Sequence, residues 1–232
     1  MRYNRSMKTG IVIAWRPQPS RVAPFEFVRN WYAKHYPDSK IYLADKPGPF
    51  WNMSGSRNLG VRLAEADGCD LVIISDADTF PDFDSLNEAL EFAMNDNLIH
   101  NPYTKAFEYD KDSSDKILSG ADCRDLPHRE HTSTGGIYVC KPSSWWAVGG
   151  SDEKFVGWGY EDSAFALAHA VINKTDIVKH NGNIYMFNHE RTEGIEKPNE
   201  NTINNFNLWR QYVDTRTPEK MLELIKIESW KP

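Results

Sequence analysis

The sequence contains few cysteines, and they do not form a recognisable pattern. Cys69, Cys123 and Cys140 are scattered and odd in number, and no two of them form a C-x-x-C pair. This spacing excludes a disulfide framework and a zinc ribbon, and it favours a reducing compartment.

The sequence also lacks long apolar and long basic runs. No stretch approaches the roughly 18 apolar residues of a membrane-spanning helix. The apolar run Ile11–Trp15 near the N-terminus is too short for a signal peptide. The net charge is −6, from 27 basic and 33 acidic residues, which disfavours a nucleic-acid partner. We therefore expect a soluble, cytoplasmic protein with neither a membrane nor a nucleic-acid partner.

The composition is that of an ordinary globular protein. Of the 232 residues, 40% are hydrophobic, 12% aromatic and 26% charged, which is enough apolar material for a core. In the first hundred residues, short apolar runs alternate with segments of helical periodicity. Strands are predicted at 10–15, 40–45 and 70–75, with helices from Pro24, over 54–66, and from Asp84 or Ser85.

This strand–helix alternation predicts an α/β fold with a mostly parallel sheet flanked by helices. Ligands of such sheets bind beyond the carboxyl ends of the strands. Arg16, Asp45 and the pair Asp76 and Asp78 all fall at such ends, so they are candidate ligand-binding residues.

The second half is less regular. The charged segment 105–132 is predicted to be a loop, and its composition suggests a lid. Further elements are a strand at 137–140, a helix at 162–172, a strand-like run at 183–187 and two terminal helices. The last helix is predicted to begin at Thr217-Pro218. A capping box of Ser85 with Glu88 is expected at the third helix.

Two carboxylates follow the clearest strand. Asp76 and Asp78 in Ser75-Asp76-Ala77-Asp78 stand two residues apart, so in an extended chain their side chains point the same way. Neighbouring carboxylates repel each other unless a cation lies between or beside them, and their oxygens suit Mg²⁺ or Mn²⁺ together with diphosphate. A turn cap is the alternative reading of an isolated D-x-D.

The segment Gly157-Trp-Gly-Tyr-Glu-Asp162 precedes the apolar helix. Its glycines allow a tight fold that leaves the indole of Trp158 exposed, where it can stack on a sugar ring. Glu161 and Asp162 would stand at the helix N-terminus, where the helix dipole favours carboxylates. The structural alternatives are core packing for Trp158 and a helix-start role for the two acids.

Taken together, these motifs resemble those of the β-1,4-galactosyltransferases and of their relatives among the polypeptide N-acetylgalactosaminyltransferases and chondroitin-type polymerases. Those proteins are GT-A fold glycosyltransferases that use nucleotide-sugar donors. The resemblance extends from about Gly10 to Asp214. Its motifs are Trp51-Asn52, Asn58-Leu59-Gly60, Ser75-Asp76-Ala77-Asp78, Thr134-Gly-Gly-Ile-Tyr138, Gly157-Trp-Gly-Tyr-Glu-Asp162 and Met186-Phe-Asn-His189-Glu-Arg191.

The resemblance implies a division of the chain and a set of metal ligands. A single GT-A domain would have a nucleotide-binding half at about 1–100, an acceptor and catalytic half at about 131–190 and a helical tail at about 200–232. Asp78 and His189 would bind Mn²⁺ or Mg²⁺, and Asp76 would contact the metal or the donor ribose.

The resemblance also implies roles for other positions. Trp158 and Glu161 would bind the acceptor and the donor sugar, and Asp162 would be the general base. The donor, expected to be a UDP-sugar, would be held by the residues of the nucleotide half and the G-G strand. These candidates are Arg16, Arg21, Asp45, Trp51, Arg57 and Gly136.

The sequence departs from the family pattern at three positions. Tyr160 replaces a glycine, which predicts a narrower sugar pocket; Ser163 replaces a third acid, and Met53 replaces an arginine. With no anchor and few cysteines, the chain would be a soluble bacterial or viral version of the family.

The expected reaction is transfer of a Gal-, GalNAc- or Glc-type sugar to a hydroxyl of a glycan, protein or small molecule. Inversion is expected, with Asp162 as base. A retaining transferase, a metal-dependent nucleotidyltransferase or phosphohydrolase, and a non-enzymatic glycan-binding module are the alternatives.

Overall fold

Three parallel strands form the start of the fold in the computed structural model, which describes residues 7–190 and 199–226. Strand β1 (Thr9–Ala14) lies between β2 (Lys40–Ala44) and β3 (Leu71–Asp76). Ala14 pairs with both Ala44 and Asp76, so the three strands end together. The predicted strands at 10–15, 40–45 and 70–75 are confirmed to within one residue at each end. The candidate ligand-binding residues Arg16, Asp45, Asp76 and Asp78 lie at or just after the ends of these strands, at one edge of the sheet.

The rest of the central sheet is mixed in direction. Strand β8 (Ile137–Cys140) is antiparallel to β3, and β5 (His100–Asn101) is antiparallel to β8. Strand β9 (Val178–Lys179) completes the order β2-β1-β3-β8-β5-β9. Because Ser75 pairs with Ile137, β8 begins at the carboxyl end of β3, and the residues that precede β8 lie at that end of the sheet.

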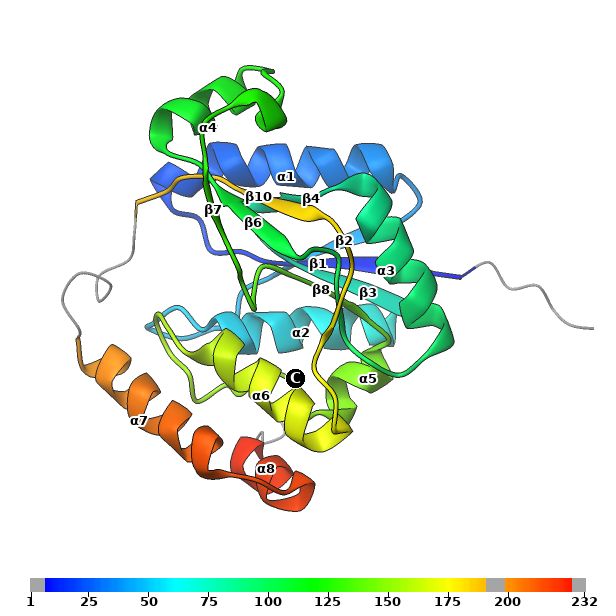
Figure 1. Cartoon of the computed structure of the whole chain (residues 1–232), viewed down its shortest axis with the longest axis vertical. Helices are drawn as coiled ribbons and strands as arrows, with labels where there is room; N and C mark the ends of the chain where they lie inside the picture. The colour runs from blue at the N-terminus through cyan, green and yellow to red at the C-terminus, as the bar shows by residue number, and fades with distance from the viewer. Residues whose placement is uncertain (1–6, 191–198, 227–232) are drawn as a thin grey trace, which may run out of the picture.

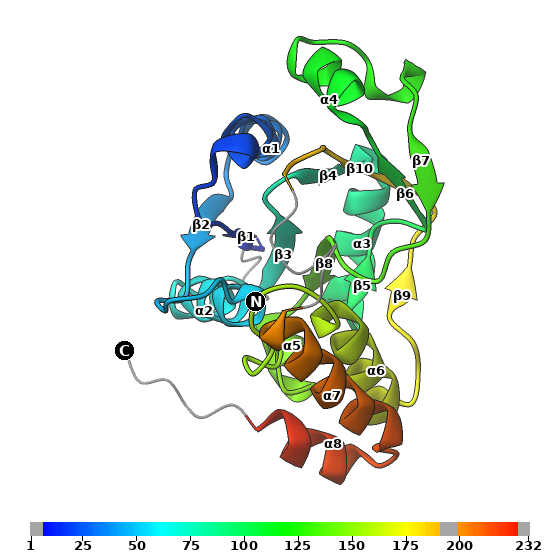
Figure 2. The same cartoon turned by 90° about the vertical axis from the view of Figure 1, so that its left-hand side faces the viewer.

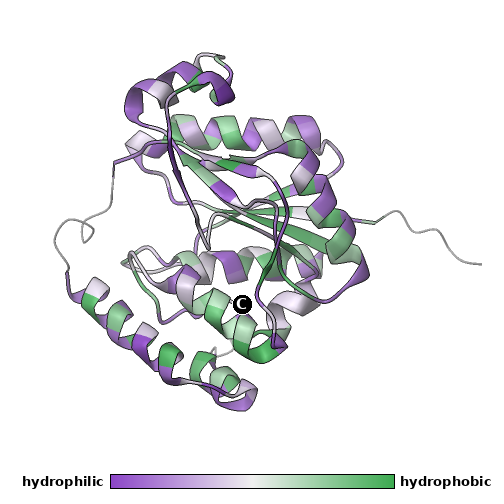
Figure 3. Ribbon diagram, in the orientation of Figure 1, coloured by the Kyte–Doolittle hydropathy of each residue, from purple (hydrophilic) through white to green (hydrophobic). Residues whose placement is uncertain are grey.

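Helices cover both faces of this sheet (Figures 1 and 2). Side chains of a strand alternate between faces, so Ile11 and Ile13 belong to one hydrophobic cluster and Val12 to the other. The first cluster packs against α1 (Val22–His35) and α3 (Phe83–Asn95). The second packs against α2 (Met53–Ala66), α5 (Pro142–Ala147) and α6 (Glu161–Asn173). Figure 3 shows the hydrophobic colouring concentrated in these central strands.

A second, smaller sheet contributes side chains to the first hydrophobic cluster. Its order is β4-β10-β6-β7, with β4 (Thr79–Pro81), β10 (Asn183–Met186), β6 (Lys105–Glu108) and β7 (Arg129–His131). Strand β10 runs antiparallel to β4, with Met186 opposite Thr79. The chain after Met186 therefore runs past Asp78, and the Phe187 amide donates to the Asp78 carbonyl at 3.0 Å.

The prediction of a loop over 105–132 is wrong. Besides β6 and β7, this segment contains α4 (Lys111–Leu118) and the short 3-10 helix η2 (Cys123–Asp125). Helix α4 is capped by Asp110, and Ile117 is buried in the first cluster. A helix of two turns in a charged stretch shows too little periodicity to be recognised from sequence.

Two predicted helix starts have different outcomes. The capping box of Ser85 with Glu88 does not form, because α3 begins at Phe83 and the Ser85 hydroxyl donates to the Pro102 carbonyl at 2.6 Å. The start of the last helix is confirmed, since Thr217 caps α8 (Pro218–Ile225).

The C-terminal helices pack on α6. Helix α7 (Glu200–Asp214) and α8 share a third buried cluster with α6 that includes Phe155 and Tyr212 (Figure 1). Within residues 7–190 and 199–226, no helix is both long and apolar enough to cross a membrane.

Candidate active site

A cleft opens where the parallel strands end. It encloses about 1200 Å³ of empty space, part of it open to solvent, which is ample for a nucleotide-sugar. Its walls come from the ends of β3 and β10, the start of α6, and the 105–132 segment. The lining residues are Arg21, Trp51, Met53, Asp76, Asp78, Glu108, His131, Gly157, Trp158, Glu161, Asp162, Met186, Phe187, Asn188 and His189.

Asp78 and His189 meet on one wall of this cleft. The β4–β10 register brings them together across 111 positions of sequence, with His189 Nε2 3.4 Å from Asp78 Oδ2. Arg21, which ends the short 3-10 helix η1 (Pro19–Arg21), donates through Nε to the same oxygen at 2.9 Å. A carboxylate oxygen and an imidazole nitrogen thus converge beside a guanidinium group.

Arg57 joins two carboxylates that line the cleft. Its side chain is 1% exposed and donates to Asp76 Oδ1 at 2.8 Å and to Asp162 Oδ1 at 2.6 Å. Burial, with the nearby charges of Asp162 and Asp78, raises the pKa of Asp76 although Arg57 opposes the shift. Arg57 does not line the cleft. It therefore holds two cleft carboxylates from below, whereas the sequence suggested contact with the diphosphate.

The Asp162 carboxylate has one occupied and one available oxygen. Oδ1 accepts from Arg57 and from the Tyr138 hydroxyl at 3.0 Å. Burial raises the pKa of Tyr138 well above its usual value, so this hydroxyl stays protonated. No hydrogen bond from the described residues reaches Oδ2. A Cβ on Gly135 would lie 1.9 Å from Oδ2, so only glycine fits beside this carboxylate.

Glu161 stands next to this base in the first turn of α6. Burial, reinforced by the charge of Asp162, raises the pKa of Glu161 to about 7. The group is therefore close to half protonated at neutral pH, and it can donate or accept a hydrogen bond in the cleft.

Substitution Glu161→Gln is expected to flatten the pH dependence of stability. An acid whose pKa is raised by folding favours the folded state below its unfolded pKa of 4.5, and this contribution is lost as the pH rises. The wild-type free energy of unfolding should fall between pH 4.5 and about 7 more steeply than that of the variant. Urea titrations across this range measure both slopes, and equal slopes would contradict the shift.

Two tryptophans flank the cleft. Trp158 is 46% exposed, as the flanking glycines predict. Trp51 also lines the cleft, and the guanidinium of Arg16 lies 5.5 Å from the centroid of its ring. Arg16 also forms an ion pair with Asp45 at 2.7 Å. Neither Arg16 nor Asp45 lines the cleft, so the structure places this pair behind Trp51.

Other family-like motif residues hold the scaffold. The Asn58 amide accepts from the Trp145 indole at 2.9 Å and from the Ser151 amide at 3.0 Å. Gly60 allows close packing of α2, because a Cβ there would lie 2.2 Å from Val12. Asn52 caps α2 by accepting from Gly55 at 2.6 Å.

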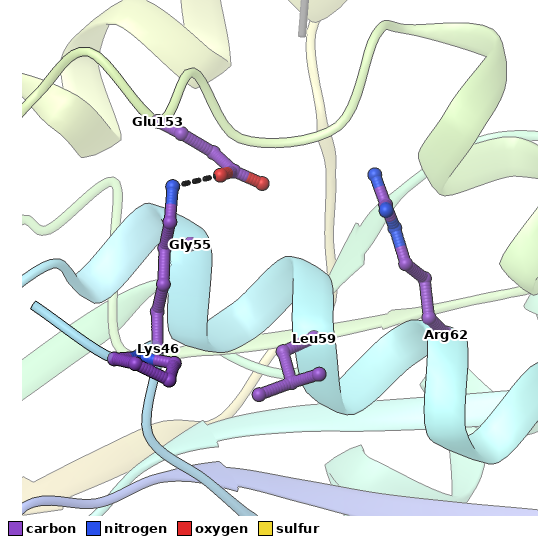
Figure 4. A pocket seen from close by; sticks show the side chains of 6 residues that line it. Lys46, Gly55, Leu59, Arg62 and Glu153 are labelled. Carbon is purple, nitrogen blue, oxygen red and sulfur yellow. Dashed lines mark hydrogen bonds and ion pairs between the residues drawn. The ribbon is translucent and has the colours of Figure 1, made fainter. Parts of the chain in front are cut away.

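A small pocket beside α2 contains an ion pair that stabilises this scaffold. Lys46 and Glu153 point toward each other and form an ion pair (Figure 4). Arg62 of α2 also lines this pocket, and its guanidinium lies 5.1 Å from the ring centroid of Trp146. Glu153 also accepts from Asn58 at 2.9 Å. The pair joins the segment before Trp51 to the segment before Trp158.

Several predicted positions lie elsewhere than expected. Gly136 does not line the cleft; its carbonyl accepts from the Asp76 amide at 2.8 Å. Tyr160 was expected to narrow the sugar pocket, and this is wrong, because its ring contacts Phe206 and Trp209 of α7 instead. Arg191 lies outside the described residues.

The structure adds two cleft residues that sequence reasoning missed. Glu108, at the end of β6, and His131, at the end of β7, both line the cleft, and they lie 3.5 Å apart. Reading 105–132 as a loop hid them. The four residues 105–108, Lys-Ala-Phe-Glu, show no alternation of polar and apolar side chains, so the sequence offered no strand signal there.

The donor set on the Asp78 wall fits a divalent metal completed by substrate oxygens. Within the described part of the chain, no group of three or more His, Cys, Asp or Glu side chains could hold a metal. Asp78 and His189 would provide two ligands, whereas Asp76 is turned toward Arg57. Sites for Mg²⁺ and similar ions commonly combine one or two protein ligands with phosphates and water, so a pair of this kind is compatible with such a site.

Comparison with known proteins places this cleft in a family context. A family model described as the N-terminal domain of galactosyltransferase matches residues 118–190, which include Trp158, Asp162 and His189. A solved structure of GalNAc-T7 with UDP, GalNAc and Mn²⁺ superposes with a TM-score of 0.55 at 10% identity, covering 94% of this chain and 54% of that one. This likeness confirms the GT-A fold, and the family match supports a glycosyltransferase.

A second solved structure has a lower TM-score. The catalytic domain of Drosophila beta1,4-galactosyltransferase 7 in complex with xylobiose has a TM-score of 0.49 at 18% identity, covering 76% of this chain and 68% of that one. A search of curated protein sequences finds no match.

Proposed function

We propose that this protein is a metal-dependent glycosyltransferase that moves a sugar from a nucleotide-sugar, with UDP as the expected carrier, to an acceptor hydroxyl. The observation that carries the proposal is that two groups of functional side chains line one cleft. One is Asp78 with His189, whose Nε2 lies 3.4 Å from Asp78 Oδ2, and the other is Asp162, whose Oδ2 accepts no hydrogen bond from the described residues. The shared fold and the galactosyltransferase-family segment support the same reaction class.

The donor would lie along the Asp78 wall. A divalent metal, when held by Asp78 and His189, would supply positive charge for the diphosphate leaving group. Arg21 sits at the same oxygen of Asp78, so its guanidinium can also bind phosphate oxygens. Trp51 offers an aromatic surface to the nucleobase at the mouth of the cleft.

Asp162 would act on the acceptor. Its Oδ2 accepts the proton of the attacking hydroxyl while the acceptor oxygen forms a bond to the anomeric carbon. The bond from that carbon to the diphosphate breaks, and its electron pair leaves with the nucleoside diphosphate. For inversion, the acceptor oxygen would attack the anomeric carbon from the side opposite the diphosphate.

The chain's own residues prepare this step before the substrates bind. Arg57 and Tyr138 fix the carboxylate through Oδ1, which leaves Oδ2 as the proton acceptor. Such preorganised charges avoid the reorganisation that water would require. Trp158 provides the apolar face against which an acceptor ring can stack.

A panel of nucleotide-sugars tests the proposal. A cognate donor with Mn²⁺ should raise the melting temperature strongly, and incubation with acceptor should release nucleoside diphosphate. Release of pyrophosphate or phosphate would indicate a nucleotidyltransferase or phosphohydrolase instead. Glycan binding with no response to nucleotide or Mn²⁺ would indicate a binding module. The product anomer, read by NMR, separates inversion from retention.

A further inference from the structure

The backbone around Trp158 is irregular and needs partners from outside its own segment. Gly157, Gly159 and Tyr160 all have positive φ, at 76°, 104° and 72°. A backbone with these φ angles cannot form the regular hydrogen bonds of a helix or a strand. Buried backbone amides and carbonyls nevertheless need hydrogen-bond partners. The partners of this segment therefore show what determines the position of the indole.

The side chain of Asn205 in α7 forms three hydrogen bonds with the backbone of this segment. Its side chain is 2% exposed, and Oδ1 accepts from the Val156 amide at 3.2 Å. Nδ2 donates to the Val156 carbonyl at 3.0 Å and to the Trp158 carbonyl at 3.2 Å. On the other side, the Gly157 amide donates to the Trp51 carbonyl at 2.9 Å. The loop is thus fixed between the nucleotide side of the cleft and α7.

Tyr160 is held by the same helix. A left-handed conformation is unfavourable for a residue other than glycine, so the surroundings must stabilise it. The Tyr160 ring lies 5.5 Å from those of Phe206 and Trp209. Tyr160 is also the N-cap of α6. Contacts with α7 therefore fix both Trp158 and the first turn of α6, which carries Asp162.

We propose that α7 supports the acceptor site from outside the cleft and that Asn205 is a positioning residue, which holds the Trp158 platform against the acceptor sugar. This inference rests on the proposed transferase function. Neither the family-matched segment 118–190 nor the predicted motifs include Asn205, and its side chain does not line the cleft. It acts through the backbone of Val156 and Trp158.

The test compares Asn205→Ala with Asn204→Ala, a neighbouring exposed asparagine on the same helix. Loss of up to three hydrogen bonds at Asn205 should raise the acceptor KM about tenfold or more, with the donor KM unchanged. Hydrogen exchange of a peptide covering 155–160, read by mass spectrometry, should accelerate, because the Val156 amide loses its acceptor. The Asn204→Ala variant should match the wild type in both measurements.

A second variant tests the proposal if Asn205→Ala does not fold. Asn205→Asp keeps the acceptor for the Val156 amide but cannot donate to the two carbonyls, and it should also raise the acceptor KM selectively. Donor and acceptor KM values that rise together, or an acceptor KM equal to that of Asn204→Ala, would overturn the positioning role alone. Absence of sugar transfer by the wild type would instead overturn the proposed function, and the inference with it.

Discussion

Replacing Asp162 by asparagine is expected to lower kcat by about 10²–10⁴-fold, the usual contribution of a general base. An amide oxygen can still accept from Arg57 and Tyr138, so the network around Oδ1 is kept. The amide nitrogen that replaces Oδ2 cannot accept the acceptor's proton. Initial rates of nucleoside diphosphate release measure the effect, and the affinity for the donor should change little.

A matched control is Asp84→Asn, which removes an exposed carboxylate from the first turn of α3. This variant should retain wild-type kcat. If Asp162→Asn also turned over at the wild-type rate, another group would be the base. A parallel loss of donor binding would show that Asp162 mainly shapes the donor site.

Arg57→Met is expected to destabilise the fold by about 3–5 kcal/mol, the usual cost of leaving a buried charge without its partner. The substitution leaves both Asp76 and Asp162 without their guanidinium partner. Urea unfolding followed by circular dichroism measures the loss. Arg57→Lys should recover only part of it, because a single ammonium group cannot reproduce the planar fork that reaches both carboxylates.

The loss caused by Arg57→Met should also depend on pH. The pKa of Asp76 is already raised by burial, and removing the arginine raises it further. A raised carboxyl pKa favours the folded state at low pH and loses that contribution as the pH rises. The deficit should therefore be smallest in acid and grow toward neutral pH.

Arg29→Met is the control for this comparison. Arg29 forms an exposed ion pair with Glu26, and pairs of this kind contribute about 0–1 kcal/mol. A loss at position 57 no larger than that at position 29 would show that Arg57 does not hold the two carboxylates in solution.

The sequence predicts the parts of this fold that have strong local patterns. The apolar run at 70–75 and its acidic end correspond to β3 and to two cleft carboxylates. The glycines around Trp158 predict its exposure. These features depend on a few neighbouring residues, so a single sequence contains the information.

Long-range geometry could not be predicted in this way. The approach of His189 to Asp78 depends on the β4–β10 register, which joins residues more than a hundred positions apart. The double ion pair of Arg57 depends on three elements meeting below the cleft. In sequence, Asn205 is one of several asparagines in a polar helix, and only packing against the Trp158 loop distinguishes it.

The prediction of a loop over 105–132 was wrong for another reason. Its strands have three or four residues, and its helix has two turns. Such elements are stabilised by pairing with β10 and by burial of single residues such as Ile117, because local helix or strand preference is weak over so few positions. Glu108 and His131 were missed with them.

Metal-dependent binding of UDP, measured by titration calorimetry, tests the central claim most directly. Wild-type protein should bind UDP tightly with Mn²⁺ and at least about tenfold more weakly without it. His189→Ala should abolish this difference, whereas His35→Ala, at the far end of α1, should preserve it. Equal UDP affinity with and without Mn²⁺ in the wild type, or full Mn²⁺ dependence in His189→Ala, would contradict the account.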